Sequence, residues 1–499
     1  MTPDLLLGID SGTSLVKAAL FDLAGHEIAA ESAAIEQSSP RADWAETGMD
    51  AAWHRAAATV RRLLSEIDPG RIACVGVTGC MVGAWLIDAH GQPVRDAILW
   101  NDGRTQPLID RLSEAHPGLM SRIFASSGSV MQQGCTLPVL RWLADHEPDT
   151  LARTRWVLGC KDWLRYRLTG VVAGDETEAS VAPGDAVGRC RSNDMLRLLG
   201  ADAWADRLPA AQACASVGGL VTAEAAAATG LLAGTPVAVG AGDVPSSAVG
   251  AGVVVAGRAC TVLGTTCLNG VAVAAPVFEP RDAGLLFCLP GGMWLRTMVN
   301  VAGTTNLDWA LARLLVGGFA EAERLAAGVA PGAEGVIYLP YLASVGVISP
   351  FVEPAARADF FGLTDRHETA HLLRAVYEGI ACSIRDCYAA LPVAVSEIRL
   401  TGGGSQSRFL AQMIADVSGL RVVVPEGAQF GAKGAALLAG VAVGLFTDVA
   451  ATQACVRAAR VHEPNQAAHR RYGAVFAGYR ELRRALLPVW QSAARRSRS

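Results

Sequence analysis

Two short turns of the same chemistry, far apart along the chain, constrain the fold more than any other feature. Each consists of a glycine followed by two hydroxyl side chains, Gly12-Thr13-Ser14 in the first and Gly264-Thr265-Thr266 in the second. Each turn separates two apolar runs that are typical of hairpin strands. The four strands are predicted at residues 5–9, 15–21, 258–263 and 267–273. The repetition indicates an internal duplication, and therefore two lobes of related structure.

The two copies differ at positions that carry charge. The first hairpin contains Asp10 and Lys17, where the second has Val262 and Asn269. One reactive centre in a cleft shared by both lobes explains this asymmetry better than two independent sites. The length of 499 residues agrees, because single hydrophobic cores stop growing at about 250–300 residues. We therefore predict one domain over residues 1–246 and a second over residues 247–499.

The rest of the chain alternates between helical and strand patterns, which predicts an α/β protein. Helices are predicted over residues 49–67, 104–114, 137–146, 367–391, 407–418 and 432–443. Further strands are predicted over residues 72–77, 84–87, 334–340, 398–400 and 421–424.

The composition argues against several classes of partner. The net charge is −4 and no lysine/arginine stripe dominates any segment, so we expect neither a nucleic-acid nor an acidic-membrane partner. The most lipid-like run, residues 434–446, is too short to span a bilayer, and no secretory signal is visible. The 12 cysteines form no CxxC pair, which favours free thiols in a reducing cytoplasm. A homodimer is left open, because the sequence does not fix the oligomeric state.

The glycine turns suit the phosphates of a nucleotide. Backbone N–H groups in a tight turn converge on an anion, and glycine has no Cβ that would keep the phosphate away. Asp10 lies two residues before Gly12 and suits Mg²⁺, which prefers a few carboxylates and retained waters. Lys17 lies on the outgoing strand, where its charge can face the same cleft. The alternative is an ordinary hairpin turn with a solvated lysine, and the repetition in mid-chain favours the phosphate-binding interpretation.

A third glycine turn, Gly402-Gly403-Gly404, continues with Ser405 and Gln406; it follows a predicted strand and opens a predicted helix. A nucleotide can closely approach a helix N-terminus at such a place. The alternative is a purely structural strand–helix turn. The GxGxxG fingerprint is absent here, and the lack of a Walker A motif excludes P-loop kinase chemistry.

Seven motifs in register resemble the FGGY family of carbohydrate kinases, which contains xylulokinase, glycerol kinase, gluconokinase and erythritol kinase. They lie at residues 8–14, 76–79 with 98–105, 161–170, 240–243, 263–266, 338–363 and 401–405. The resemblance covers nearly the whole chain. It implies a duplicated ribonuclease H-like fold of the actin/hexokinase ATPase type, with two lobes around a central cleft. It also implies ATP and Mg²⁺ as cofactors.

The resemblance assigns roles to individual residues. Asp243, which ends the loop Gly240-Ala241-Gly242-Asp243, matches the family's general base, and Asp10 matches its magnesium-associated aspartate. The phosphate and adenosine contacts are expected at Gly12, Thr13, Ser14, Lys17, Gly264, Thr265, Thr266, Gly402, Gly403, Gly404 and Gln406. A base is needed because a sugar hydroxyl has a pKa far above 7, so a carboxylate at about 2.6–3.2 Å must accept its proton. Asp243 as a helix N-cap is an alternative that is compatible with this role.

The sugar is expected on the first lobe. Its contacts are expected at Met81, Val82, Trp100, Asn101, Asp102 and Asp243. For Asn101 and Asp102 the alternative is capping of the helix that begins near Thr105. Trp163 and Tyr166 are expected to be packing residues.

Two departures from the family pattern limit the choice of substrate. Xylulokinase-like members usually carry Gln-Met-His-Gly where this chain has Cys80-Met81-Val82-Gly83, and a sugar hydroxyl left unpaired costs about 1–3 kcal/mol. Lys433 stands where the family usually has an apolar residue, with a solvated helix residue as the alternative reading. We expect a small sugar such as the pentulose xylulose as substrate, and a polyol or tetrose derivative, as for erythritol kinase, as the alternative.

Two other functions remain open. An actin-fold ATPase would share both hairpins, but would not need the signature at residues 161–170 or Asp243. A degenerate family member would bind sugar or nucleotide without transfer. The retention of Asp10, Lys17 and Asp243 argues against the second of these.

Overall fold

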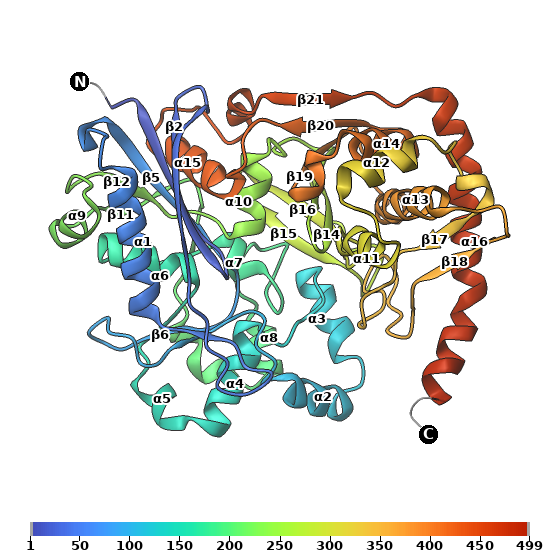
Figure 1. Cartoon of the computed structure of the whole chain (residues 1–499). Coiled ribbons are helices and arrows are strands. Elements are labelled where there is room, and N and C mark those ends of the chain that lie inside the picture. The colour runs from blue at the N-terminus through green and yellow to red at the C-terminus, as the bar shows by residue number, and fades with distance from the viewer. Residues whose placement is uncertain (1–2, 497–499) are drawn as a thin grey trace.

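The computed structural model describes residues 3–496 and contains two large mixed β-sheets (Figure 1). The six-stranded sheet has the order β11-β12-β5-β1-β2-β3, and the seven-stranded sheet has the order β15-β16-β14-β13-β19-β20-β21. The first consists of β1 (Leu5–Ser11), β2 (Leu15–Asp22), β3 (Glu27–Ala34), β5 (Ile72–Gly79), β11 (Val217–Leu220) and β12 (Pro236–Ala238). The second consists of β13 (Arg258–Leu263), β14 (Cys267–Val273), β15 (Leu285–Leu289), β16 (Met293–Asn300), β19 (Glu397–Thr401), β20 (Arg421–Pro425) and β21 (Ala458–His462).

The two sheets repeat one arrangement around the predicted hairpins. In the first, β1 pairs antiparallel with β2 and parallel with β5. In the second, β13 pairs antiparallel with β14 and parallel with β19. The duplication predicted from the glycine turns is therefore confirmed, and with it the two-lobed fold of the actin/hexokinase type.

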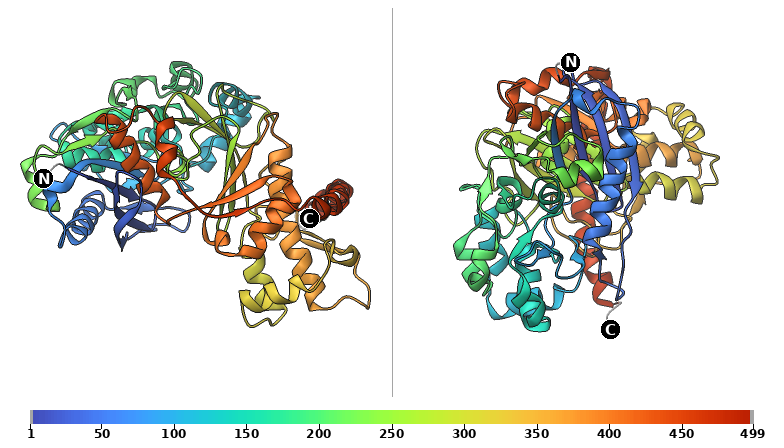
Figure 2. Two further views of the ribbon diagram at one scale, coloured as in Figure 1. Left: turned by 90° about the horizontal axis from the view of Figure 1, so that it is seen from above. Right: turned by 90° about the vertical axis from the view of Figure 1, so that its left-hand side faces the viewer.

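Helices cover both sheets. They include α1 (Met49–Leu63), α4 (Thr136–His146), α6 (Cys160–Thr169), α10 (Asp243–Gly250), α11 (Thr305–Arg313), α13 (Thr369–Ala389), α14 (Arg408–Ser418), α15 (Phe430–Ala442) and α16 (Gln466–Arg496). The others are α2 (Gln106–Ala115), α3 (Leu119–Ser127), α5 (Pro148–Arg153), α7 (Glu176–Ser180), α8 (Asn193–Leu198), α9 (Ala223–Thr229) and α12 (Phe319–Ala327). Short strands outside the main sheets are β4 (Glu46–Thr47), β6 (Trp85–Ile87), β7 (Ala97–Ile98), β8 (Trp156–Leu158), β9 (Gly174–Asp175), β10 (Ala211–Gln212), β17 (Ile337–Leu339) and β18 (Asp359–Phe361). Figure 2 shows α16 at the outer edge of the second lobe, far from the N-terminus.

One helix crosses between the lobes. α15 follows β20 of the second sheet, yet it packs on β1 and β5 of the first sheet and on α10 (Figure 1). Glycines permit this close approach, because a Cβ on Gly8 or Gly76 would overlap carbonyl oxygens of Ala432 or Ala435 in α15. The predicted domain boundary after residue 246 falls inside α10, and it stays a prediction.

Most predicted elements exist, but several end differently. The helix predicted over residues 49–67 ends at Leu63, and Leu64 leaves the helical conformation before Pro69. The strand predicted over residues 334–340 shrinks to β17, because Glu334 has a left-handed backbone (φ 51°) in a 3₁₀ turn. Within residues 3–496 all 12 cysteines are free, as predicted. No helix in this range is long and apolar enough to cross a membrane.

Candidate active site

Asp243 and the second glycine turn line one cavity between the lobes. Asp243 is the first residue of α10, directly after the loop that leaves β12. The cavity measures about 220 Å³ and is also lined by Gly264, Thr265, Thr266 and Thr401. The structure therefore brings together two segments that the sequence motifs predicted to meet, the aspartate loop and the second turn.

Two acidic side chains influence each other in this region. Burial raises the pKa of Asp243 to about 7, and the negative charge of Asp10 adds to the increase. Burial also raises the pKa of Asp10 to about 6, although Lys17, its partner across the β1–β2 hairpin, opposes that shift. Asp10 at the end of β1 and Asp243 at the start of α10 thus lie close enough to interact electrostatically.

The crossing of α10 and α15 fixes both carboxylates. The Ser246 hydroxyl of α10 donates to the carbonyl oxygen of Gly431 in α15, at 3.1 Å. A Cβ on Gly431 would overlap Oδ2 of Asp10, so only glycine leaves room for this carboxylate. The same glycine thus touches the helix that carries Asp243 and the strand that carries Asp10.

The second and third of the predicted nucleotide turns meet at the end of β13. Gly402 has φ 83°, and a Cβ there would contact the Leu263 carbonyl oxygen just before the second turn. The Thr304 backbone N–H, before α11, donates to the Gly264 carbonyl at 2.8 Å. Motif reasoning missed the Gly303-Thr304 segment, whose only signal is another glycine followed by threonines after a strand.

Two details of the third turn differ from expectation. The triple glycine does not open α14 itself, because a 3₁₀ turn over Gly403–Gln406 intervenes and Ser407 caps the helix. Gln406 lines a different cavity, of about 270 Å³, together with Arg408 and Arg460. The structure therefore brings Gly402 to the second turn but not Gln406 to the cavity of Asp243.

The predicted sugar segment adjoins Asp243. Met81 packs against Gly242, where a Cβ would overlap its side chain. Val82 has a left-handed backbone (φ 57°), which is strained for a β-branched residue and is held by a 2.6 Å bond from its N–H to Oε1 of Glu178. Burial raises the pKa of Glu178 to about 8, with the charges of Asp175 and Asp162 as further causes. The only sequence signal for Glu178 was the acidic run of residues 175–178.

Trp100 links this segment to the first turn, because its Nε1–H donates to Oγ1 of Thr13 at 2.8 Å. Asn101 beside it is exposed. Asp102, in contrast, is completely buried: Oδ1 pairs with Nε of Arg104 at 2.7 Å, and Oδ2 accepts from the Ala45 N–H at 2.7 Å. Both readings of Asp102 are therefore corrected. Its carboxylate faces the protein interior and not the cavity of Asp243. It also does not cap α2, because the N-cap residue of that helix is Thr105.

The motif at residues 161–170 belongs to a buried network that contacts the loop before Asp243. Lys161 is buried and pairs with Asp162 at 2.5 Å and with Asp175 at 2.7 Å. Asp175 caps α7, and the hydroxyl of Thr177 accepts the N–H of Gly242 at 3.0 Å. This buried network holds the residue before Asp243 in place.

The aromatic residues of the same motif pack as predicted. Trp163 is buried, and its Nε1–H donates to the Met49 carbonyl at 2.8 Å. Tyr166 stacks against it with ring centroids 5.9 Å apart.

The donor set fits a magnesium ion that arrives with a nucleotide. Within residues 3–496 no group of three or more His, Cys, Asp or Glu side chains could hold a metal by itself. Mg²⁺ is usually bound by one or two carboxylates together with substrate phosphates and waters. Asp10, whose carboxylate accepts no hydrogen bond from another described side chain, meets that requirement.

A duplicated hairpin fold, with an acidic side chain and the second glycine turn lining one cavity, is the arrangement expected of a two-lobed phosphotransferase. The chain belongs to the FGGY family of carbohydrate kinases. It matches the N-terminal domain of that family over residues 5–250 and the C-terminal domain over residues 259–443. It is therefore an ATP:sugar phosphotransferase.

Individual relatives agree with this assignment. Erythritol kinase of Brucella abortus (strain 2308) is 34% identical over 521 residues, covering 98% of each chain. Xylulose kinase of Escherichia coli (strain K12) is 32% identical over 494 residues, covering 97% of this chain and 100% of that protein. The crystal structure of xylulose kinase from Rhodospirillum rubrum has a TM-score of 0.89 at 28% identity, covering 98% of this chain and 100% of that one.

Proposed function

We propose that Asp243 is the general base of this kinase and accepts the proton of a sugar hydroxyl during transfer of the γ-phosphoryl group of ATP. The observation that carries the proposal is its position: Asp243 lines the same cavity as Gly264, Thr265 and Thr266, with its pKa raised to about 7. A general base is most effective when its pKa lies near the working pH.

The glycine turns are proposed to bind ATP. The Gly12 and Gly264 N–H groups donate to the Leu15 and Thr266 carbonyls of their own hairpins, so the hydroxyls of Thr13 and Thr265 are proposed to hold the phosphates from the two lobes, with glycine leaving room for their approach. Asp10 would hold Mg²⁺, which neutralises charge on the phosphate oxygens when it is bound. The Gly402–Gly404 turn then approaches the adenosine side, because it abuts the second phosphate turn.

The transfer step needs one proton acceptor and an in-line path. The substrate oxygen forms a bond to the γ-phosphorus, and its proton passes to the Asp243 carboxylate. The bond between the γ-phosphorus and the bridging oxygen breaks, and its electron pair leaves with ADP. Closure of the lobes would exclude water and so suppress hydrolysis of ATP.

The acceptor is proposed to be a pentulose such as xylulose, with a tetritol such as erythritol as the second candidate. Val82 favours the second candidate, because it offers no imidazole to a ketose. Glu178, held against the Val82 N–H, supplies a polar group at the same place, and its pKa of about 8 leaves its carboxyl mostly protonated at neutral pH. A cytoplasmic location and a homodimer stay predictions.

A coupled assay of ADP release tests the proposal. It compares D-xylulose, L-xylulose, erythritol, pentitols and glycerol as acceptors, with mass spectrometry of the phosphorylated product. We expect one acceptor to raise ADP release far above the rate without sugar, and D243N to abolish the increase. Equal release with and without every acceptor would instead support an ATPase, and no release at all would support a binding protein.

A further inference from the structure

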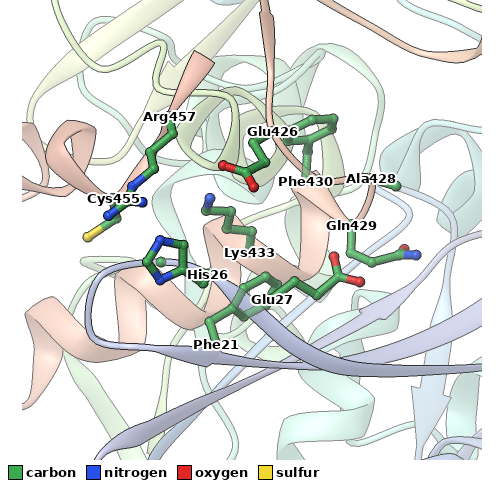
Figure 3. Close-up of a pocket in the computed structure, with 12 residues that line it drawn as sticks. Phe21, His26, Glu27, Glu426, Ala428, Gln429, Phe430, Lys433, Cys455 and Arg457 are labelled. Atoms are coloured by element: carbon green, nitrogen blue, oxygen red, sulfur yellow. The ribbon is translucent and has the colours of Figure 1, made fainter. Parts of the chain in front are cut away.

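A second large cavity lies at a crossing between the lobes, apart from the cavity of Asp243. It measures about 360 Å³ and shares no lining residue with the Asp243 cavity (Figure 3). One wall is the turn between β2 and β3, with His26 and Glu27. The other wall is the loop from β20 to α15, with Glu426, together with Arg457 just before β21.

Lys433 of α15 points into this cavity (Figure 3). The alternative that it is a solvated helix residue is wrong, because only 5% of it is exposed. No hydrogen bond or ion pair joins its ammonium group to any other residue within 3–496. Burial lowers its pKa, although nearby groups that include Glu426 and Glu27 oppose the shift. The Lys433 Nζ is not among the buried side-chain atoms that lack a partner, so it meets the cavity, and a cation there without a carboxylate partner favours an anionic ligand.

The choice of lysine here is unusual for this chain. The sequence contains only three lysines, Lys17, Lys161 and Lys433, against 40 arginines among its 43 basic residues. The first is the partner of Asp10 across the hairpin, and the second is the centre of the buried ion network. Lys433 is thus the one lysine whose charge the fold and the proposed active site do not use.

The other charged groups of the cavity are also unpaired with one another. Among the described residues, no ion pair joins Glu27, Glu426, Lys433 or Arg457. His26 is engaged with Asp22 at 2.8 Å. Figure 3 shows the Arg457 and Lys433 side chains among the residues that line the cavity. Two cations that line one cavity suit a phosphate, since arginine binds it as a fork and lysine as a point charge, while carboxylates accept hydrogen bonds from hydroxyls.

The walls of the cavity belong to both lobes. Residues 426–429 connect β20 in the second sheet to α15 on the first sheet, and the Glu426 N–H donates to the Arg457 carbonyl at 2.9 Å. On the opposite side Gly25, with φ 81°, lies so close to Cys455 that a Cβ would overlap its carbonyl oxygen. A ligand that fills this space therefore contacts segments of both lobes.

We propose that this cavity is an effector site for a small phosphorylated sugar or polyol, with the phosphate bound by Lys433 and Arg457 and the hydroxyls by Glu27 and Glu426. Occupancy changes the closure of the lobes and hence the turnover at Asp243. The site does not depend on which acceptor the kinase phosphorylates.

Isothermal titration calorimetry with D-ribose 5-phosphate, inorganic phosphate and D-ribose tests the proposal, with saturating MgADP to occupy the nucleotide side of the cleft. The variants are Lys433→Met, Arg457→Gln and, as a matched control on the exposed face of α16, Arg471→Gln. We expect ribose 5-phosphate to bind more tightly than phosphate, and ribose not to bind. Lys433→Met and Arg457→Gln should each weaken binding of ribose 5-phosphate at least tenfold, and Arg471→Gln should not.

Several results would overturn this assignment. Unchanged affinity in both cavity variants would place any binding elsewhere, and absence of binding to the wild-type chain would remove the site. Equal affinity for phosphate and ribose 5-phosphate would remove the hydroxyl contacts of Glu27 and Glu426. Because Arg457 is exposed, Arg457→Gln keeps the test valid even where Lys433→Met fails to fold. Addition of ribose 5-phosphate should also change ADP release by the wild-type chain and not by Arg457→Gln.

Discussion

The pH dependence of phosphoryl transfer follows directly from the surroundings of Asp243. Only the ionised carboxylate accepts a proton, and its pKa is raised to about 7. Half of the enzyme is therefore competent at pH 7 and about a tenth at pH 6, so kcat/KM should fall about fivefold between these values. Below pH 6 the fall should be steeper than tenfold for each further pH unit, because Asp10, whose pKa is raised to about 6, then also becomes protonated. An aspartate at the ordinary value of 3.8 would leave the rate flat down to about pH 5.

The assay is the initial rate of ADP release at subsaturating sugar and ATP, because kcat/KM reports the pKa values of the free enzyme. The control is Asp10→Asn, which removes a negative charge that raises the pKa of Asp243. Its overall rate should be lower, but its midpoint should move to lower pH. A profile that is flat from pH 5 to pH 8, or a midpoint that Asp10→Asn leaves in place, would refute the electrostatic reasoning.

Three substitutions test the surroundings of the two aspartates. Val82→His should raise kcat/KM for D-xylulose relative to erythritol by about 5- to 150-fold, since a restored hydrogen bond is worth about 1–3 kcal/mol. An unchanged ratio would show that the side chain at position 82 does not contact the sugar. Gly431→Ala should lower kcat/KM by about 100-fold with little change in the thermal midpoint, because its methyl group displaces Asp10; full activity would show that Asp10 need not stay where it lies. Trp100→Phe removes the bond to Thr13, so it should raise the KM for substrates while unfolding free energy changes by about 1 kcal/mol or less.

Features of the fold that depend on a few neighbouring residues could be predicted from the sequence. The glycine turns at residues 12–14 and 264–266 each lie between apolar runs, so both hairpins and the duplication could be predicted. The role of Asp243 came from the family resemblance, and the local pattern predicted only that this residue follows a short apolar strand and small residues. Helix ends could be predicted less well, since the helical pattern of apolar residues continues to residue 67 although the helix ends at Leu63.

The burial of individual side chains and the contacts between distant segments could not be predicted from the sequence. Asp102 looked like a ligand or a cap, yet Arg104 and the Ala45 N–H draw it into the interior. A solvated helix residue was the alternative for Lys433, but the turn between β2 and β3 covers it from the other lobe. Glu178 reaches the sugar segment only through tertiary packing. The burial of these three side chains depends on contacts between residues about 60 to 400 positions apart. For Asp102 it also depends on a compact turn whose geometry the residue types do not fix.

The central claim is that one carboxylate, at the start of α10, removes the proton from the acceptor hydroxyl. The most direct measurement compares wild type with Asp243→Asn in single-turnover phosphoryl transfer, with calorimetric titration of MgATP on the same preparations. The asparagine keeps the size and the N-terminal position in α10 but cannot accept the proton. We predict a loss of about 10²- to 10⁴-fold in transfer with the affinity for MgATP within about threefold of wild type. Transfer at the wild-type rate by Asp243→Asn would contradict the claim.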